Sequence, residues 1–197
     1  MRGMIEVITE KQKSVSDREL VLKCQRGDRG AFRHLYRLYQ PKIRSTLYQL
    51  CGQEFLEDFV QEVFLKVWHG LPKLRSPEYF STWVYRITCN VAIDGRRQLA
   101  KRQMRIAKST DQENSFDSES RPQDSPDLMQ LHYEEVVRQG LEILSLEHRA
   151  VLVLHDLEDL PQKEIAEILE IPLGTVKSRL HYARKTMGQF LQKQGVL

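Results

Sequence analysis

The sequence is poor in the features that mark secreted, membrane-spanning and metal-binding proteins. Its 197 residues include three cysteines, Cys24, Cys51 and Cys89, and no two of them stand at the spacing of a metal or redox motif. No apolar run approaches the roughly 18 residues of a membrane span, and no secretory signal segment is apparent. We therefore expect a cytoplasmic protein with reduced thiols, no bound metal, no cofactor and no membrane insertion.

The alternation of apolar and polar residues that indicates a β-strand is also missing, and nearly every apolar pattern has helical spacing. Pro41 is expected to interrupt or kink the second helix. The fold class is therefore predicted to be all-α. The expected helices cover about 17–25, 31–50, 55–69, 80–101, 128–144, 147–157, 161–169 and 173–192.

One stretch differs in composition from the rest of the chain. Residues 109–127, "STDQENSFDSESRPQDSPD", contain one aromatic and no aliphatic side chain. Such a segment cannot offset its ordering entropy by burial, so we expect a flexible acidic linker. The sequence thus predicts two small helical domains, 14–102 and 129–194, joined by a linker over 103–128.

The charges are distributed unevenly along the chain. Residues 1–102 carry 19 Lys and Arg against 11 Asp and Glu, whereas residues 129–170 carry 3 against 10. Residues 171–197 carry 5 basic residues and no acid. Two basic zones with an acidic zone between them suggest two separate surfaces for a polyanion.

The second basic zone contains "IPLGTVKSRLHYARK", residues 171–185. On a helical wheel one side of this segment is apolar, and the opposite side is small and polar. The apolar side holds Leu173, Val176, Leu180 and Ala183; the polar side holds Gly174, Thr175, Ser178 and Tyr182; Lys177 and Arg179 lie between the two. With the helix at 161–169 and a short turn, this pattern indicates a helix-turn-helix whose polar side meets base edges and whose cations meet phosphates. An ordinary amphipathic helix with a solvated basic side is the alternative.

This part of the chain resembles region 4 of bacterial sigma factors of the extracytoplasmic-function (ECF) group, from "LSLEHRAVLVLHDLEDL" through "EIAEILEIPLGTVKSRL". The resemblance implies contacts to the −35 promoter element from Thr175, Lys177, Ser178, Arg179 and Tyr182, and the small Gly174 permits close approach. There are two departures from the family pattern. Tyr182 stands where many members carry Arg. Glu170 occupies a turn position that is commonly glycine, where a left-handed backbone would add about 1 kcal/mol of strain.

The segment "EDFVQEVFLKVWHGL", residues 57–71, has an apolar stripe for the core and a polar side opposite it. Leu65 is a large aliphatic residue in the centre of that polar side, among Asp58, Gln61 and Glu62. It fits an interface anchor with a polar rim, although a single exposed leucine can also be without function. The segment resembles sigma region 2.2, which implies that these four residues dock on the clamp helices of the largest RNA polymerase subunit.

The next segment, "YFSTWVYRITCNVAIDGRRQLAKRQMR", interleaves aromatic and basic residues. Phe80, Val84, Ile87 and Val91 can form a buried stripe, leaving aromatic and basic side chains for unpaired bases and their backbone. A buried Trp83 on a solvated basic helix is the alternative. The segment is similar to sigma regions 2.3 and 2.4. This implies a −10 DNA site with a flipped base near 72–80 and with contributions from Tyr79, Trp83, Arg86, Asn90, Arg96 and Arg97.

The combined pattern predicts a non-enzymatic sigma factor that joins core RNA polymerase, recognises −35 and −10 elements and helps to melt promoter DNA. Its expected partners are core polymerase and double- and single-stranded promoter DNA, with an anti-sigma factor as a further candidate. A helix-turn-helix regulator that never joins polymerase is the alternative. A helical hydrolase is a third reading, because His155, Asp156, Glu158 and Asp159 cluster in the sequence. They are interpreted instead as a solvated loop, since no nucleophile–base pair or metal spacing accompanies them.

Overall fold

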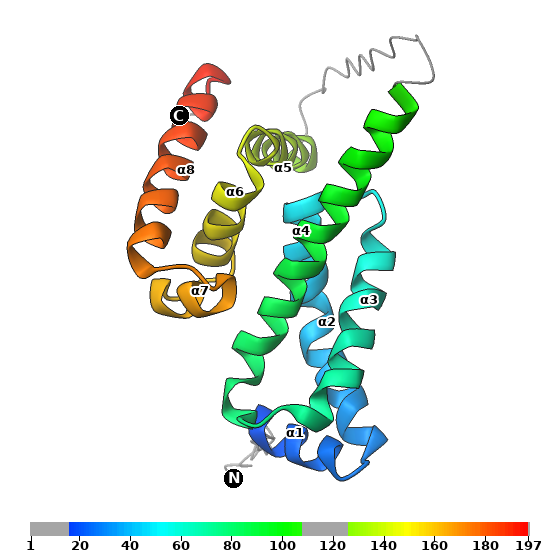
Figure 1. Ribbon diagram of the computed structural model, residues 1–197. Coiled ribbons are helices and arrows are strands. Elements are labelled where there is room, and N and C mark those ends of the chain that lie inside the picture. The colour runs from blue at the N-terminus through cyan, green and yellow to red at the C-terminus, as the bar shows by residue number, and fades with distance from the viewer. Residues whose placement is uncertain (1–15, 108–125, 197) are drawn as a thin grey trace, which may run out of the picture.

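The computed structural model describes residues 16–107 and 126–196, and every regular element in these ranges is a helix or a helical turn (Figure 1). This confirms the all-α prediction. The N-terminal half contains α1 (Asp17–Gln25), α2 (Arg29–Cys51), α3 (Leu56–Gly70), the turns η1 (Leu71–Lys73) and η2 (Pro77–Tyr79), and α4 (Phe80–Ala107). The C-terminal half contains α5 (Pro126–Glu142), α6 (Leu146–Leu152), the π-helical turn η3 (Val153–Leu157), α7 (Gln162–Leu169) and α8 (Leu173–Lys193).

Helices α4 and α5 extend beyond their predicted bounds, and α2 is continuous at Pro41. Of the two outcomes predicted at Pro41, an interruption or a kink, the structure excludes the interruption, because α2 runs through this residue. Pro41 and Arg37 are both exposed, so the Arg37 carbonyl that loses its helical donor can be hydrated by water. Helix α4 continues to Ala107 and α5 begins at Pro126, so both predicted ends of the linker fall within helices. The predicted linker between them lies outside the described residues.

Local hydrogen bonds explain where several helices begin. The Ser16 hydroxyl accepts the Glu19 N–H at 3.3 Å, and the Asp28 carboxylate accepts the Gly30 N–H at 2.7 Å. Ser145 likewise accepts the His148 N–H at 3.4 Å at the start of α6. Short polar side chains at these positions satisfy N–H groups that have no partner within the first helical turn.

The N-terminal half is built around α2, α3 and α4, with α1 lying across one end of them (Figure 1). The side of α3 that the sequence predicted to be apolar is buried, which confirms its orientation. That buried stripe consists of Leu56, Val60, Val63, Phe64, Val67 and Leu71. In α4, Phe80, Val84 and Val91 are buried as predicted, whereas Ile87 is only partly buried.

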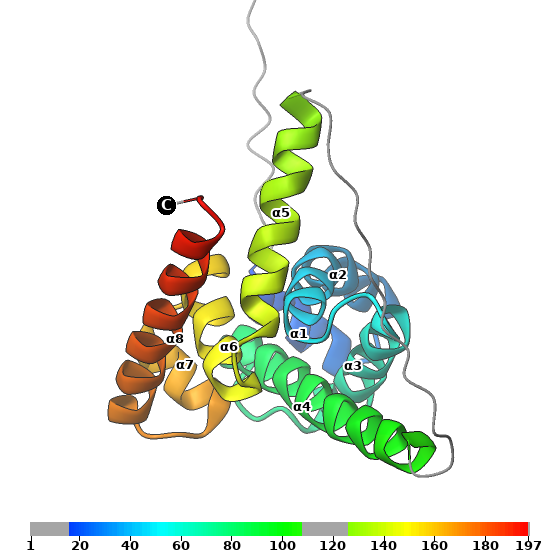
Figure 2. The same cartoon turned by 90° about the horizontal axis from the view of Figure 1, so that it is seen from above.

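In the C-terminal half, α6, α7 and α8 enclose Val151, Leu154, Ile165 and Leu180. This half does not stand apart from the first. Helix α7 packs on α4, η3 packs on α2, and the buried apolar residues of both halves form one connected cluster (Figures 1 and 2). The sequence predicted two domains but not their packing. Within the described residues, none of the helices has the length and apolar character needed to cross a membrane.

Two helical glycines provide a test of the packing. A Cβ added at Gly95 in α4 would lie 2.4 Å from the Phe59 ring, whereas one added at Gly188 in α8 would meet nothing within 4 Å. We expect Gly95→Ala to destabilise the protein by about 1–3 kcal/mol through overpacking. Gly188→Ala should stabilise α8 by about 0.5–1 kcal/mol. Urea unfolding of both variants measures the difference, and equal stability would contradict the packing of Phe59 on α4.

Candidate functional site

The predicted polymerase-binding residues lie together on the exposed side of α3. Asp58, Gln61, Glu62 and Leu65 are all exposed, and 51% of Leu65 is accessible. Glu62 pairs with Lys66 at 2.9 Å, one turn further along the helix. The exposure of these four residues follows from helical periodicity, because the opposite side of α3 is buried in the core.

An aromatic residue that the sequence prediction did not include extends this surface. Trp68, one turn beyond Leu65, is 43% exposed, and its ring lies edge-on against Phe32 of α2 with centroids 4.7 Å apart. Tyr36, also of α2, is 41% exposed and packs on Phe64. Leu65 is therefore part of a larger apolar and aromatic surface shared by α2 and α3. The i, i+3 spacing of Leu65 and Trp68 was the signal that could have revealed it.

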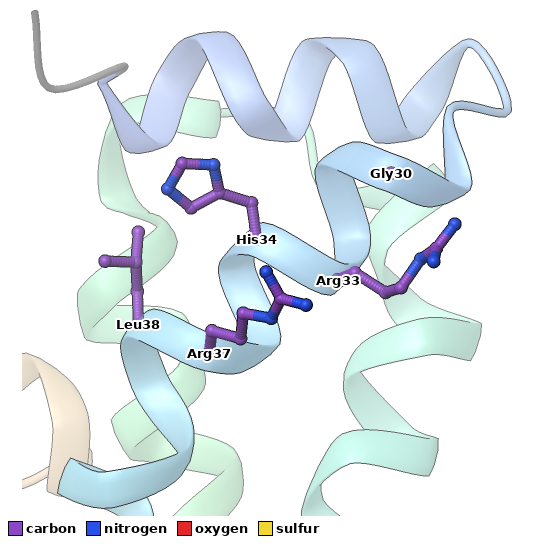
Figure 3. A pocket seen from close by; sticks show the side chains of 5 residues that line it. All are labelled: Gly30, Arg33, His34, Arg37 and Leu38. Carbon is purple, nitrogen blue, oxygen red and sulfur yellow. The ribbon is translucent and has the colours of Figure 1, made fainter. Parts of the chain in front are cut away.

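Helix α2 also carries a basic groove that the sequence analysis did not identify. Arg33, His34 and Arg37 project from its N-terminal half together with Leu38 (Figure 3). No ion pair to these three basic side chains is found in the described part of the chain. Arg44, further along α2, is by contrast neutralised by Glu57 at 2.9 Å. The groove is thus a basic surface with an apolar edge at Leu38.

The residues predicted to contact the −10 element fall into two groups. Tyr79 in η2 is 58% exposed, and Asn90 and Arg97 of α4 are also exposed. Arg97 lies 3.9 Å from Asp94. Trp83 is only partly buried, but its ring packs closely on α3, since a Cβ at Gly70 would come within 2.7 Å of it. Part of the indole is thus used in packing on α3.

Arg86 and Arg96 contact other parts of the protein instead of projecting freely into solvent. Arg86 donates to the Glu167 carbonyl at 2.9 Å and pairs with the Glu170 carboxylate at 3.1 Å, both in the C-terminal half. Arg96 donates to the Leu50 carbonyl at 3.4 Å. The structure therefore separates these two arginines from Tyr79, Asn90 and Arg97.

Helices α7 and α8 form the predicted helix-turn-helix. The Ile171 N–H donates to the Ala166 carbonyl at 3.1 Å and closes the turn. Glu170 adopts the left-handed conformation with φ 55° and ψ 42°. The left-handed backbone considered for this position is therefore observed, and it is one in which a residue with a Cβ is less favourable than glycine.

The apolar stripe of α8 is buried at Val176, Leu180 and Ala183, so the predicted orientation of the helix is confirmed. On the other side, Gly174, Lys177, Ser178 and Tyr182 are exposed, whereas Thr175 and Arg179 are half-buried. The Ser178 hydroxyl donates to the Thr175 carbonyl at 3.0 Å. The six residues predicted to contact the −35 element thus share one end of α8.

Among the residues considered for hydrolysis, Asp156 and Asp159 are exposed, as expected for a solvated loop, whereas Glu158 is not. Asp156 pairs with Arg184 of α8, whose hydrogen bond holds the pKa of this carboxyl below its ordinary value. Glu158 is half-buried and accepts hydrogen bonds from the N-terminal half, so the prediction that it is solvated was wrong. Its partners lie far away in the sequence, where local patterns carry no information about them.

The described residues hold neither a recognisable metal cluster nor an activated thiol. No group of three or more His, Cys, Asp and Glu side chains there could hold a metal ion. Burial raises the pKa of the Cys24 and Cys51 thiols to about 11 and that of Cys89 to about 12. These thiols stay protonated at neutral pH and are poor nucleophiles.

Comparison with known proteins identifies the two helical halves. Residues 35–102 match the family model "Sigma-70 region 2", and residues 134–187 match "Sigma-70, region 4". The chain is 30% identical over 182 residues to the ECF RNA polymerase sigma-E factor of Escherichia coli K12, covering 90% of this chain and 95% of that protein. The chain belongs to the ECF sigma factors. It is 32% identical to the RNA polymerase sigma-H factor of Pseudomonas aeruginosa, over 89% of this chain and 94% of that protein.

As an ECF sigma factor, the protein is a polymerase-binding, promoter-directing subunit and not an enzyme. Its fold is also that of solved relatives. CnrH in complex with the cytosolic domain of CnrY superposes with a TM-score of 0.66 at 23% identity, over 90% of this chain and 97% of that one. RpoE of Bartonella quintana in complex with the anti-sigma factor NepR gives 0.63 at 19% identity, over 82% and 96%.

The turn of the helix-turn-helix gives a prediction about stability. Glu170→Gly and Glu170→Ala both remove the carboxylate that pairs with Arg86, so they differ only in the Cβ at a left-handed position. We expect the glycine variant to be more stable than the alanine variant by about 1 kcal/mol. Thermal or urea unfolding measures this. A more stable alanine variant would mean that the turn does not hold the left-handed conformation in solution.

Proposed function

We propose that this sigma factor binds core RNA polymerase through the exposed side of α3 and reads promoter DNA through α4 and α8. The supporting observation is that one chain presents both an exposed α3 surface with Leu65 as an apolar anchor and a helix-turn-helix with a polar outer side. A regulator acting without polymerase needs only the second of these. The protein then acts in the cytoplasm, where polymerase and promoter DNA are found, with residues 14–102 as region 2, 103–128 as the linker and 129–194 as region 4.

The proposed partner of the exposed side of α3 is the pair of clamp helices of the largest polymerase subunit. Leu65 supplies an apolar anchor, while Asp58, Gln61 and Glu62 supply acceptors around it. Desolvated apolar anchors surrounded by polar groups carry most of the binding energy in protein interfaces. Trp68 extends the apolar part of this surface, and the acceptors around Leu65 can pair with basic side chains of the partner.

In α4 and η2, unpaired bases and phosphates of the melted −10 element are the proposed ligands. Tyr79 offers an exposed ring for stacking, and Asn90 and Arg97 are accessible further along α4. Trp83, Arg86 and Arg96 complete the proposed site, although the latter two must first leave their contacts to other parts of the protein.

On α8, Ser178 and Tyr182 read bases of the duplex −35 element, supported by Gly174 and Thr175. Lys177 and Arg179 bind phosphates.

An anti-sigma protein is a further proposed partner. The Bartonella quintana RpoE, which shares this fold, is held by the anti-sigma factor NepR. The α3 surface and the α2 groove are accessible in the structure and could accept such a protein.

Binding to core polymerase is tested by reconstitution. The purified chain, mixed with core enzyme, should co-elute in gel filtration and give run-off transcripts from a subset of genomic fragments. Asp58→Arg and Leu65→Glu should each weaken core binding by about 2 kcal/mol or more, because one inverts a charge and the other removes an anchor. Circular dichroism should be unchanged.

Ile143→Glu is the matched control for Leu65→Glu, since Ile143 is a similarly exposed aliphatic residue, 53% accessible, in the C-terminal half. It should retain core binding. Retention of wild-type affinity by both α3 variants would exclude this surface from the polymerase interface.

The role of α8 is tested with a randomised −35 library. Ser178→Ala and Tyr182→Ala should change which sequences are selected, with a loss of about 1–3 kcal/mol on the preferred site. Lys177→Ala should weaken all sites nearly equally and reduce the salt slope by about one unit. If Lys177→Ala changes the preferred sequences while Tyr182→Ala does not, α8 is rotated about its axis relative to the proposed orientation on DNA.

A further inference from the structure

The outer side of α8 carries a large aromatic ring among small and charged side chains. Tyr182 is 58% exposed, and Gly174, Lys177 and Ser178 on the same side of the helix are exposed as well. Ser178 and Tyr182 are one helical turn apart, so their side chains are neighbours on the helix surface. Because an uncharged ring attracts phosphates only weakly, Tyr182 is suited to a contact with a base and not with the DNA backbone.

The Tyr182 ring is held in place by a second ring that belongs to α6. Its centroid lies 6.4 Å from that of His148, with an angle of 51° between the two planes. Aromatic rings attract each other in tilted arrangements at such distances. His181, the preceding residue of α8, adds a further ring at 5.5 Å and 73°. The orientation of Tyr182 is therefore restricted, while more than half of the residue stays accessible.

His148 is itself fixed at the beginning of α6. Its backbone N–H donates to the Ser145 hydroxyl at 3.4 Å, and the same hydroxyl lies 3.1 Å from Nδ1 of the His148 ring. The next three residues, Arg149, Ala150 and Val151, are buried. Helix α6 packs on α8 (Figures 1 and 2). His148 thus connects the rigid core of this half to the ring that α8 exposes.

The chemistry of the major groove decides which base suits such a ring. Thymine presents an apolar C5 methyl group there, which the other three bases lack. Packing this methyl group on an aromatic ring removes apolar surface of both groups from water. Such a contact has no directional hydrogen bond to align it, so its selectivity depends on how firmly the ring is held.

We propose that Tyr182 recognises a thymine of the −35 element through its ring, and that His148 of α6 is the positioning residue that holds this ring. The inference rests on the proposed reading of the −35 element by α8, and it adds the base and a residue outside α8. His148 acts through Tyr182 and needs no contact of its own with DNA.

Selection from a randomised −35 library, with the full chain free and in the reconstituted holoenzyme, tests the choice of base. Wild type should select thymine at a position about two base pairs from the one that Ser178→Ala changes, because one helical turn is about 5.4 Å long and base pairs are about 3.4 Å apart. Tyr182→Arg should select guanine there, since a guanidinium bonds to O6 and N7 of guanine. Tyr182→Phe keeps the ring and should still select thymine. Loss of the thymine preference in Tyr182→Phe would assign the contact to the hydroxyl and contradict a contact through the ring.

Replacing that thymine by deoxyuridine removes only the methyl group from the DNA. Wild type should bind the deoxyuridine promoter about four-fold more weakly, as expected when one apolar carbon is no longer buried. Tyr182→Ala should bind the two promoters equally well. If wild type also bound them equally, the thymine contact would be excluded.

His148→Ala tests the positioning role. It should reduce the effect of the methyl group from about four-fold to below about two-fold, because the Tyr182 ring loses its support from α6. His148→Phe keeps a ring at this position and should restore most of the effect. His34→Ala is the matched control, since His34 is an exposed histidine of α2 in the other half of the chain, and it should behave as wild type. Circular dichroism should be the same for all variants, and a full methyl effect in His148→Ala would overturn the positioning role.

The outcomes separate this inference from the proposed function. If Tyr182→Ala changes the selected sequences but deoxyuridine has no effect, α8 reads the −35 element and the thymine contact is wrong. If Tyr182→Ala selects the same sequences as wild type, the proposed −35 role of Tyr182 is wrong as well.

Discussion

The burial of α4 on two sides constrains the rest of the molecule. One side, with Phe80, Val84 and Val91, fills the core of the N-terminal half. The neighbouring side, with Thr82 and Tyr85, is buried against the C-terminal half. Of the proposed −10 residues on α4, Arg86 is engaged by this packing through Glu167 and Glu170.

Helical periodicity was enough to predict the features that depend on one side of one helix. The buried stripes of α3 and α8 follow from spacings of three and four residues, and so does the exposure of Leu65 and Ser178. The same reasoning found only the side of α4 that faces the core of the N-terminal half. A helical wheel was used to find one apolar stripe, so the buried side with Thr82 and Tyr85 was overlooked. Trp68 was missed for a related reason, since an aromatic residue beside an apolar stripe is readily assigned to the core.

The contacts between the halves could not be predicted from the sequence. Thr46 and Glu158 are 112 positions apart, and nothing in the spacing of either residue refers to the other. An acidic residue in "HDLEDL" has the composition of a solvated loop, and only the packing of η3 on α2 places Glu158 next to its donors. Arg149 is similar, because a charged residue in the middle of an apolar helix is buried only where carbonyl groups can receive it.

The turn between α7 and α8 shows how a locally unfavourable residue can serve the larger structure. Glycine would relieve the left-handed strain at position 170, but it would also remove the carboxylate that pairs with Arg86. Arg86 would then keep only the Glu167 carbonyl, while its Nε remains buried without a partner. The strain lies within one half, whereas the ion pair joins the two halves. A residue that opposes folding of the turn by itself thus favours the packing of one half on the other.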